Sequence, residues 1–193
     1  MRKAIALTTF ALLLCTLGSA QATTVLKVNT AQMAHTSQWV VRANVLSVKT
    51  VDLRHEGRAL FTDIELAFTE IYGGKAVPSR YTLRLIGGTG ADGVVLKIPG
   101  MPVFHAGEDV VLFLEKTPVG HIPCGLGQGV FRVLNTPSGD LWVRQATGHV
   151  NLLKRAKNGR LTTAHPTFDE TNMPLDTLVS KIHHALLGGK NTP

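Results

Sequence analysis

The chain has 193 residues, of which 44% are hydrophobic and 17% are charged. This length suits one domain with a sizeable core, and the lack of a Ser-, Pro- or charge-rich linker argues against a division into several domains. The 20 Lys and Arg residues exceed the 13 Asp and Glu residues, so an anionic surface would attract the protein at low ionic strength.

The N-terminus has the pattern of a secretory signal peptide. Two basic residues precede an apolar run over residues 4–17, and small residues stand at Ala20 and Ala22. The run is too short for a stable membrane span, and no later run is long or apolar enough for one. We therefore expect cleavage after Ala22, which removes residues 1–22 and exports residues 23–193 to the periplasm or out of the cell.

Cleavage would also change the charge and the cysteine content. It removes Arg2, Lys3 and Cys15, which leaves 18 of the 20 basic residues against 13 acidic ones and a formal charge of +5. Cys124 is then the sole cysteine, so the mature chain has no internal disulfide and its stability has to come from packing. Leu14 is too large for the position before a lipid-attachment cysteine, which argues against a lipoprotein signal.

Most of the mature sequence alternates apolar and polar residues with the period of a β-strand. A short helix with Thr30 as its cap is predicted over residues 30–37. Residues 110–114 are apolar at every position, which indicates a central strand covered on both faces. A C-terminal amphipathic helix is predicted over residues 174–187, with Pro174 in its first turn. The remaining predicted strands are residues 39–48, 60–72, 80–85, 130–134, 141–145, 150–155 and 160–163.

Turn residues join these strands into hairpins and corners. Asn158-Gly159 suits a tight hairpin turn, and the stretch over residues 87–107 combines Gly87-Gly88, Asp92-Gly93 and Pro99-Gly100. We interpret that stretch as corners that steer the chain into the buried strand. The elements together predict a mainly β fold: one small antiparallel barrel over residues 38–163, OB-like or sandwich-like, within a single exported domain.

Over residues 38–135 the sequence resembles a family of uncharacterised exported bacterial proteins. The motif residues that carry this resemblance are Thr62-Asp63, Gly73-Gly74, Gly87-Gly88, Pro99-Gly100-x-Pro102-x-Phe104, Gly107-Glu108-x-Val110-Val111-Leu112-Phe113-Leu114 and Gln128-Gly129-x-Phe131-Arg132-Val133. More distantly, a short helix, a barrel and a terminal helix resemble OB-fold barrels, including their netrin-like branch. The resemblance implies export and a barrel, and it assigns no functional residue.

Three patterns invite a catalytic or phosphate-binding interpretation. Gly87-Gly88-Thr89-Gly90 lacks both the Gly-Lys-Ser/Thr ending and the following helix of a phosphate loop, so we interpret it as a turn. Asp63 and Glu65 share a strand face as paired acids do, but a hairpin in which paired numbers sum to 149 would place Glu65 opposite Arg84 as a solvated ion pair. His121 lies three residues before Cys124 and could activate its thiol, although no residue is identified that would orient the histidine.

Other chemistries have less support in the sequence. The eight histidines show no metal-ligand spacing, and no calcium loop or cysteine pair is present, so we expect no metal and no cofactor. No serine lies in a nucleophile elbow. The densest basic cluster is Lys154, Arg155, Lys157 and Arg160, at a predicted hairpin tip that could meet an anionic polymer or lipid headgroups.

Three functional hypotheses follow from the sequence. The leading one is an exported non-catalytic module that binds a protein, a glycan or a small ligand through barrel loops. The second is a thiol-dependent or hydrolytic enzyme centred on Cys124 and His121. The third is an electrostatic binder of an anionic polymer through residues 154–160. The oligomeric state is not encoded in any of these patterns.

Overall fold

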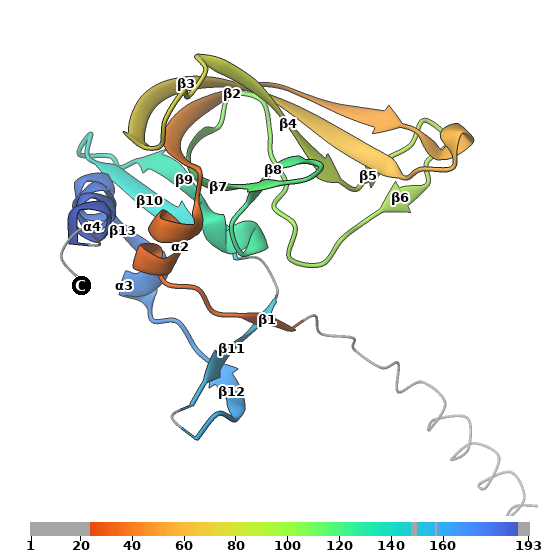
Figure 1. Ribbon diagram of the computed structural model, residues 1–193. Helices are drawn as coiled ribbons and strands as arrows, with labels where there is room; N and C mark the ends of the chain where they lie inside the picture. The colour runs from red at the N-terminus through yellow and green to blue at the C-terminus, as the bar shows by residue number, and fades with distance from the viewer. Residues whose placement is uncertain (1–23, 148–149, 157, 189–193) are drawn as a thin grey trace, which may run out of the picture.

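A computed structural model describes residues 24–147, 150–156 and 158–188 (Figure 1). The predicted signal peptide over residues 1–22 and the side chain of Lys157 lie outside these described residues. The described chain is mainly β, which confirms the predicted fold class at that level. None of its helices combines the length and the hydropathy that crossing a bilayer requires.

The largest sheet has the strand order β13-β10-β9-β7-β2-β3-β4, and β8 pairs with β7 beside this path. All neighbouring strands in it are antiparallel. Its strands are β2 (Trp39–Asp52), β3 (Leu60–Gly73), β4 (Arg80–Ile86), β7 (Asp109–Thr117), β8 (Gly120–Pro123), β9 (Val130–Asn135), β10 (Leu141–Gln145) and β13 (Asn172–Pro174). The predicted strands therefore form, most of them longer than expected.

The predicted closure of a barrel over residues 38–163 is wrong. Within the described residues, no backbone ladder joins β4 to β8 or to β13, so the sheet stays open. β13 has three residues and ends in Pro174, which has no amide N–H with which to extend a ladder. At the other edge, β4 meets β8 through the Tyr81 hydroxyl, which lies 3.0 Å from His121 Nδ1 and accepts from the His121 amide at 3.4 Å.

β7 separates two layers of core, as its fully apolar sequence predicted. Val111 and Phe113 point to one face, where they pack with the two longer helices. Leu112 and Leu114 point to the other face and pack inside the curved sheet. All four side chains are fully buried. Both faces of residues 110–114 are therefore covered, which explains the lack of polar residues in this part of β7.

The helices cover one face of the large sheet and confirm the two predicted helical segments. They are α2 (Thr30–Thr36), α3 (Phe168–Thr171) and α4 (Leu175–Gly188). α2 is capped by Asn29, one residue before the expected cap, since the Asn29 side chain accepts from the Gln32 amide at 2.8 Å. In α4, Leu178 and Ile182 are fully buried, as expected of the predicted apolar stripe.

The last predicted hairpin does not belong to the large sheet. β11 (Asn151–Arg155) and β12 (Leu161–Ala164) pair antiparallel, and β1 (Thr24–Leu26) adds to β11 in parallel. This three-stranded sheet projects from the body in Figure 1. A further two-stranded sheet, β5 (Gly88–Thr89) with β6 (Val95–Leu96), lies in the segment that was predicted to contain only corners.

The long strands β2 and β3 extend together as an arm (Figure 1). The β3–β4 register places Asp63 opposite Arg84, so the paired numbers sum to 147 and the expected sum of 149 is wrong. Arg84 therefore binds Asp63 through two hydrogen bonds of 2.6 Å, while Glu65 lies 3.5 Å from Arg80. Both acids are engaged in cross-strand ion pairs on a sheet face.

Candidate functional site

In the distal half of the β2–β3 arm, one face of the sheet does not pack against the main core. β2 and β3 each have 14 residues, whereas β4 has 7. After β4, Gly87 and Gly88 turn the chain at φ angles of 115° and 146°. The chain then forms β5 and β6 and returns toward β7 through residues 97–104 (Figure 1). The sheet face and the segment over residues 87–104 enclose a groove between them.

The groove is lined mainly by apolar side chains and has a volume of about 310 Å³. This volume lies at the lower end of the range for small-molecule sites and equals the space of on the order of ten water molecules. The polar side chains among its lining residues are three threonines, Thr50, Thr62 and Thr89, and Lys97. Its apolar walls include Val48, Ile64, Leu85, Ile98, Met101 and Phe104.

Two glycines set the depth of the groove at its inner end. A Cβ atom on Gly88 would lie 3.0 Å from both Thr50 Cγ2 and Thr62 Oγ1, and one on Gly87 would lie 2.9 Å from the Leu96 carbonyl oxygen. Thr62 Oγ1 in addition donates to the Gly87 carbonyl at 2.8 Å. The glycine pair thus allows the backbone to lie directly on the sheet, and it does not cradle a phosphate at a helix N-terminus.

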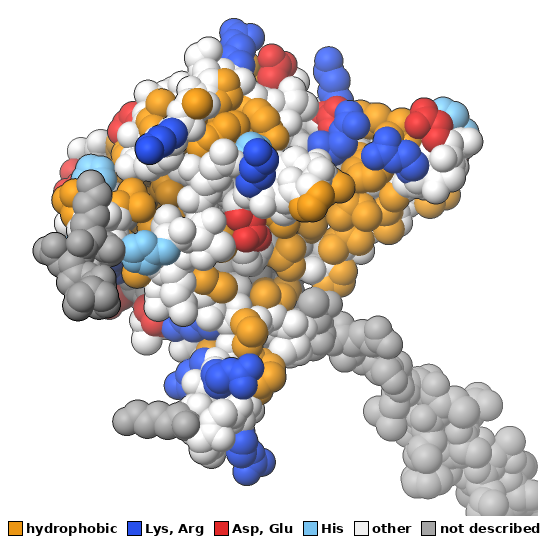
Figure 2. Space-filling view, viewed as in Figure 1, with side chains coloured by type: hydrophobic (Ala, Val, Ile, Leu, Met, Phe, Trp, Pro, Cys, Tyr) orange, Lys and Arg blue, Asp and Glu red, His pale blue; other side chains and the backbone are white. Residues whose placement is uncertain are grey.

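An exposed apolar rim continues from the groove onto the surface. Val94, Val95 and Val103 are 50%, 62% and 61% exposed, and Ile86 is 40% exposed. Figure 2 shows hydrophobic side chains gathered over this part of the molecule, beneath the arm. Isolated exposed valines are ordinary on protein surfaces, but a contiguous apolar patch beside an apolar groove is typical of a binding surface.

An ion cluster holds β5 and β6 against the tip of the arm. Arg54 donates to Asp52 at 2.6 Å and lies 3.0 Å from Asp92 in the turn before β6. Hydrogen bonds from the Arg54 side chain and backbone lower the pKa of Asp52 to about 2. The Val94 amide and Arg54 lower the pKa of Asp92. Both carboxylates therefore stay ionised across the neutral range, and the outer wall of the groove stays fixed to the arm.

The inner wall, residues 97–103, is attached to the body at a few points. The Gly127 amide donates to the Gly100 carbonyl at 3.0 Å, and Arg132 Nη2 donates to the Val103 carbonyl at 2.6 Å. A second hollow of about 470 Å³ is lined by the same segment together with Arg132, Gln145 and Ala146. We call this segment, residues 97–103, the strap.

Lys97 supplies the positive charge of the groove. It lines both the groove and the second hollow. It forms no ion pair within 4 Å among the described residues, in contrast to Arg54 and Arg84 on the arm. An anionic group at the mouth of the groove would find this ammonium group available.

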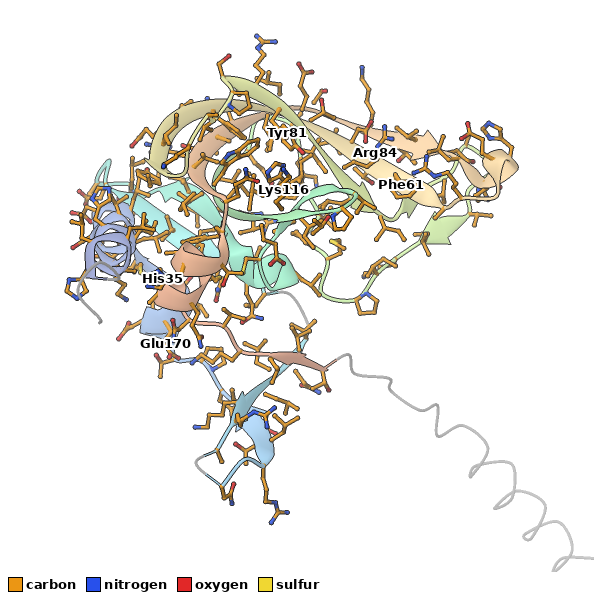
Figure 3. All side chains as sticks on the ribbon, in the orientation of Figure 1. His35, Phe61, Tyr81, Arg84, Lys116 and Glu170 are labelled. Atoms are coloured by element: carbon orange, nitrogen blue, oxygen red, sulfur yellow. The ribbon has the colours of Figure 1, made fainter. Side chains whose placement is uncertain are left out.

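His121 closes the opening between β4 and β8. Its ring stacks on Trp39 with a centroid separation of 3.9 Å, its Nδ1 lies 3.0 Å from Tyr81 Oη, and its Nε2 lies 2.8 Å from Gln38 Oε1. Tyr81 and Lys116 are labelled in Figure 3, and Lys116 of β7 is the ladder partner of His121. Burial, together with the charge of Lys116, lowers the pKa of His121. Both ring nitrogens are engaged within this aromatic cluster.

Cys124 does not have the surroundings of a nucleophile. Its side chain is buried, and burial, with the nearby charge of Glu115, raises its pKa to about 11. A catalytic thiol needs a depressed pKa and access to solvent. Since the His121 nitrogens face Tyr81 and Gln38, the structure does not join Cys124 and His121 into a catalytic pair.

The predicted basic cluster lies on the projecting sheet, away from the groove. Lys154 and Arg155 belong to β11, and Arg160 precedes β12. All three are exposed, and the Arg155 guanidinium donates to the Gly159 carbonyl at 3.2 Å. Lys157, the fourth predicted member, lies outside the described residues.

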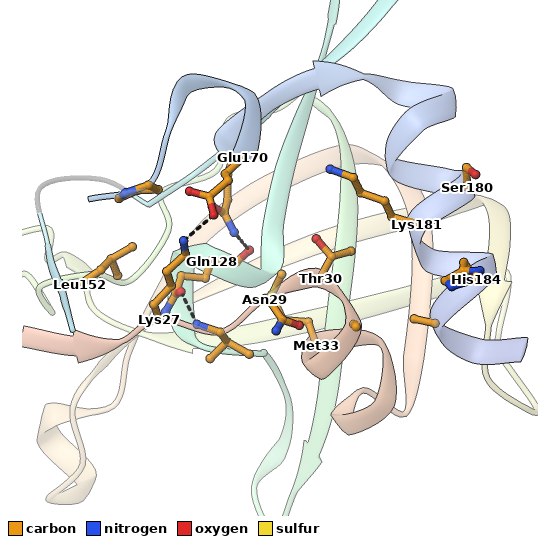
Figure 4. A pocket seen from close by; sticks show the side chains of 15 residues that line it. Lys27, Asn29, Thr30, Met33, Gln128, Leu152, Glu170, Ser180, Lys181 and His184 are labelled. Carbon is orange, nitrogen blue, oxygen red and sulfur yellow. Dashed lines mark hydrogen bonds and ion pairs between the residues drawn. The ribbon is translucent and has the colours of Figure 1, made fainter. Parts of the chain in front are cut away.

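A polar cleft lies where the projecting sheet meets the body (Figure 4). It has a volume of about 680 Å³ between α2, α4 and β11. Lys27 Nζ crosses it to Glu170 at 2.6 Å, and the buried Gln128 accepts from the Val28 amide and donates to the Leu26 carbonyl, both at 2.9 Å. Because these polar groups are paired with each other, we interpret the cleft as a seam that attaches the projecting sheet.

Within the described ranges, no group of three or more His, Cys, Asp or Glu side chains could hold a metal ion. Comparisons of the chain with protein-family models, with curated proteins and with solved structures give no significant match. The groove residues were not predicted as a site. Their sequence signal was the density of Gly and Pro residues between residues 87 and 107, which had been interpreted as corners.

Proposed function

We propose that the protein is an exported, non-catalytic binding module whose groove takes a single-chain amphiphile. The apolar body of the ligand lies between the sheet face of the arm and the strap over residues 97–103. Its anionic head lies at Lys97. The observation that supports this proposal is the apolar groove itself, which opens onto the exposed rim of Val94, Val95 and Val103. Export is part of the proposal and derives from the signal-peptide pattern.

The lining favours an unbranched apolar chain over the other ligand classes considered from the sequence. A glycan would need several hydrogen-bond partners, whereas one of the three threonine hydroxyls already donates to the backbone. An enzyme would need convergent titratable groups, and the groove contains one ammonium group and no carboxylate. The unpaired Lys97 favours an anionic head over a neutral or cationic one.

Burial of the chain supplies the affinity. Transfer of one methylene from water into an apolar site is worth about 0.8 kcal/mol, which corresponds to a factor of about four in Kd. A chain with eight buried methylenes would gain about 6 kcal/mol before the costs of ordering the ligand are subtracted. We therefore expect dissociation constants in the micromolar range or weaker, with the chain length as the main determinant.

Charged substitutions on the rim test the location of the site. The double variant V95D/V103D places two carboxylates at exposed positions, so the fold should be unaffected while dodecanoate binding weakens at least tenfold. The matched control is V119D, since Val119 is 91% exposed and lies in the turn between β7 and β8. Isothermal titration calorimetry gives Kd, and urea unfolding checks stability. Equal affinities for dodecanoate in all three proteins would refute the groove as the site.

Substitution of Lys97 tests the head group. K97M should weaken the binding of dodecanoate and leave the binding of dodecanol unchanged, because only the first ligand carries an anionic head. A loss of both ligands would indicate damage to the strap, and no loss of either would refute the role of Lys97. If dodecanoate does not bind the wild-type protein at all, the amphiphile proposal is refuted.

A further inference from the structure

The second hollow shares part of its lining with the groove. Both spaces are lined by the same five residues of the strap, namely Lys97, Ile98, Met101, Pro102 and Val103. Three further residues line the hollow and not the groove, namely Arg132, Gln145 and Ala146. The hollow, with a volume of about 470 Å³, has room for more than a carboxylate group. A ligand whose chain fills the groove therefore has a separate space beside it for a head group.

Arg132 of β9 brings a guanidinium group to the hollow. Its Nε donates to Glu108 Oε1 at 3.2 Å, and its Nη2 donates to the Val103 carbonyl at 2.6 Å. Among the described residues, Nη1 makes no hydrogen bond. The guanidinium group is therefore held in place by two partners, and the N–H groups of Nη1 are available to a ligand.

The lining of the hollow contains two cations and, within the described residues, no carboxylate. Glu108 balances the charge of Arg132 and also lies 2.9 Å from His105 Nδ1, but it does not line the hollow. Lys97 has no ion-pair partner in the described part of the chain and lines both spaces. An anion in the hollow would therefore meet the charge of Lys97 and the free N–H groups of Arg132.

We propose that the head group of the ligand is a phosphate monoester, which Lys97 and Arg132 bind together in the hollow. This inference rests on the proposed function and specifies the head group of the same ligand. A carboxylate carries one charge on two oxygens, whereas a phosphate monoester carries nearly two charges on three terminal oxygens above pH 7. The phosphate can therefore accept from the Lys97 ammonium and from Arg132 Nη1 at the same time. The planar guanidinium group matches the geometry of phosphate oxygens.

Calorimetry on the full mature chain compares head groups on chains of equal length. Decyl phosphate, decyl methyl phosphate and undecanoate each present ten apolar carbons and are used below their micelle concentrations. At pH 8, decyl phosphate should bind about tenfold more tightly than undecanoate, because it gains charge-assisted hydrogen bonds from Arg132. Decyl methyl phosphate has a single charge and should bind about as weakly as undecanoate. The affinity for decyl phosphate should also rise from pH 5.5 to pH 8, since its second proton leaves near pH 6, and that for undecanoate should not.

Variants of the ion pair test the role of Arg132. E108Q/R132Q removes the guanidinium group together with its carboxylate partner, so the net charge is unchanged and neither charge is left unpaired. It should bind decyl phosphate no more tightly than undecanoate, while its affinity for undecanoate stays near that of the wild-type protein. The control D63N/R84Q removes a cross-strand ion pair from the arm and should keep the preference for phosphate. Urea unfolding checks the fold, and R132K, which keeps the charge beside Glu108, gives the same readout if the double variant does not fold.

The outcomes separate this inference from the proposed function. If undecanoate binds and decyl phosphate binds no more tightly, the groove still takes an amphiphile and the phosphate inference is overturned. A preference for phosphate that survives in E108Q/R132Q overturns the role of Arg132 and with it the inference. Inorganic phosphate should bind far more weakly than decyl phosphate, and equal affinities would overturn the link between the hollow and the groove. If none of the chain ligands binds, both proposals are refuted.

Discussion

Replacement of Gln128 by methionine should detach the projecting sheet from the body. Gln128 is 2% exposed, and its side-chain amide makes two hydrogen bonds of 2.9 Å to the backbone of the segment that leads from β1 to α2. Methionine has a similar length and keeps the apolar contacts, but it leaves the Val28 amide and the Leu26 carbonyl without partners. Each unpaired buried backbone group costs about 1–3 kcal/mol.

The expected loss in the free energy of unfolding of Q128M is therefore about 2–4 kcal/mol. Local detachment of the segment limits this loss, because water can then solvate the two backbone groups. For a chain of this size, a loss of about 3 kcal/mol lowers Tm by roughly 6–12 °C. The matched control is Q145M, since the Gln145 amide makes a single 2.7 Å bond to the Gln128 carbonyl and its side chain is partly exposed.

Urea unfolding and hydrogen exchange measure the two parts of this prediction. In Q128M, the amides of Lys27 and Val28 should exchange faster, while amides in β2 and β7 keep their relative protection. Q145M should lose no more than about 1 kcal/mol. If Q128M unfolds within about 0.5 kcal/mol of wild type and the two amides stay protected, the interpretation of the polar cleft as an attachment seam is refuted.

Three further predictions concern single side chains. Cys124, with a pKa of about 11, should react with iodoacetamide at pH 7.5 roughly 300-fold more slowly than a free thiol, and a rate equal to that of a free thiol would contradict its burial. Because the pKa of His121 is lowered in the folded chain, the unfolded chain binds more protons than the folded one below about pH 6.5. The urea midpoint should therefore fall from pH 7 to pH 5, and it should fall less in H121Q. A midpoint that rises over this pH range would refute the lowered pKa of His121. G88A should lower the free energy of unfolding by about 1–2 kcal/mol, because φ is positive and the Cβ meets two threonines; unchanged stability would refute the close approach of Gly88 to the sheet.

The sequence predicted the elements well where the pattern was local. The unbroken apolar run over residues 110–114 correctly identified a strand with both faces in the core. Alternation in residues 60–72 and 80–85 identified β3 and β4, and the stripe of Leu178 and Ile182 identified α4. Each of these signals depends on residues that are neighbours along the chain or along one helix face.

The pairing of distant strands had no such signal. β1 pairs with β11 across more than a hundred residues, and three residues of alternating burial in the sequence Thr24–Leu26 do not specify a partner. The open sheet depends on β13, where Pro174 ends a ladder although the sequence alone placed it in a helix. The hairpin register was missed by two residues, which preserves the face of every side chain and therefore leaves the hydrophobic pattern unchanged.

The candidate groove was missed for a related reason. Gly and Pro residues indicate the local backbone conformation, and they predicted the turns at Gly87, Gly88 and Gly100, all of which have positive φ. They do not indicate which sheet face the chain covers after it turns. The apolar residues between the turns, from Val94 to Phe104, were the remaining signal, since corners that only redirect the chain do not need them.

Calorimetry with a chain-length series tests the proposed function most directly. Hexanoate, octanoate, decanoate and dodecanoate differ only in methylenes, and each pair of added methylenes should lower Kd by about 15-fold until the groove is full. V95D/V103D should flatten this dependence, and V119D should reproduce it. A Kd that does not change with chain length, or the same dependence in V95D/V103D as in the wild-type protein, would contradict an apolar chain in the groove beneath the arm.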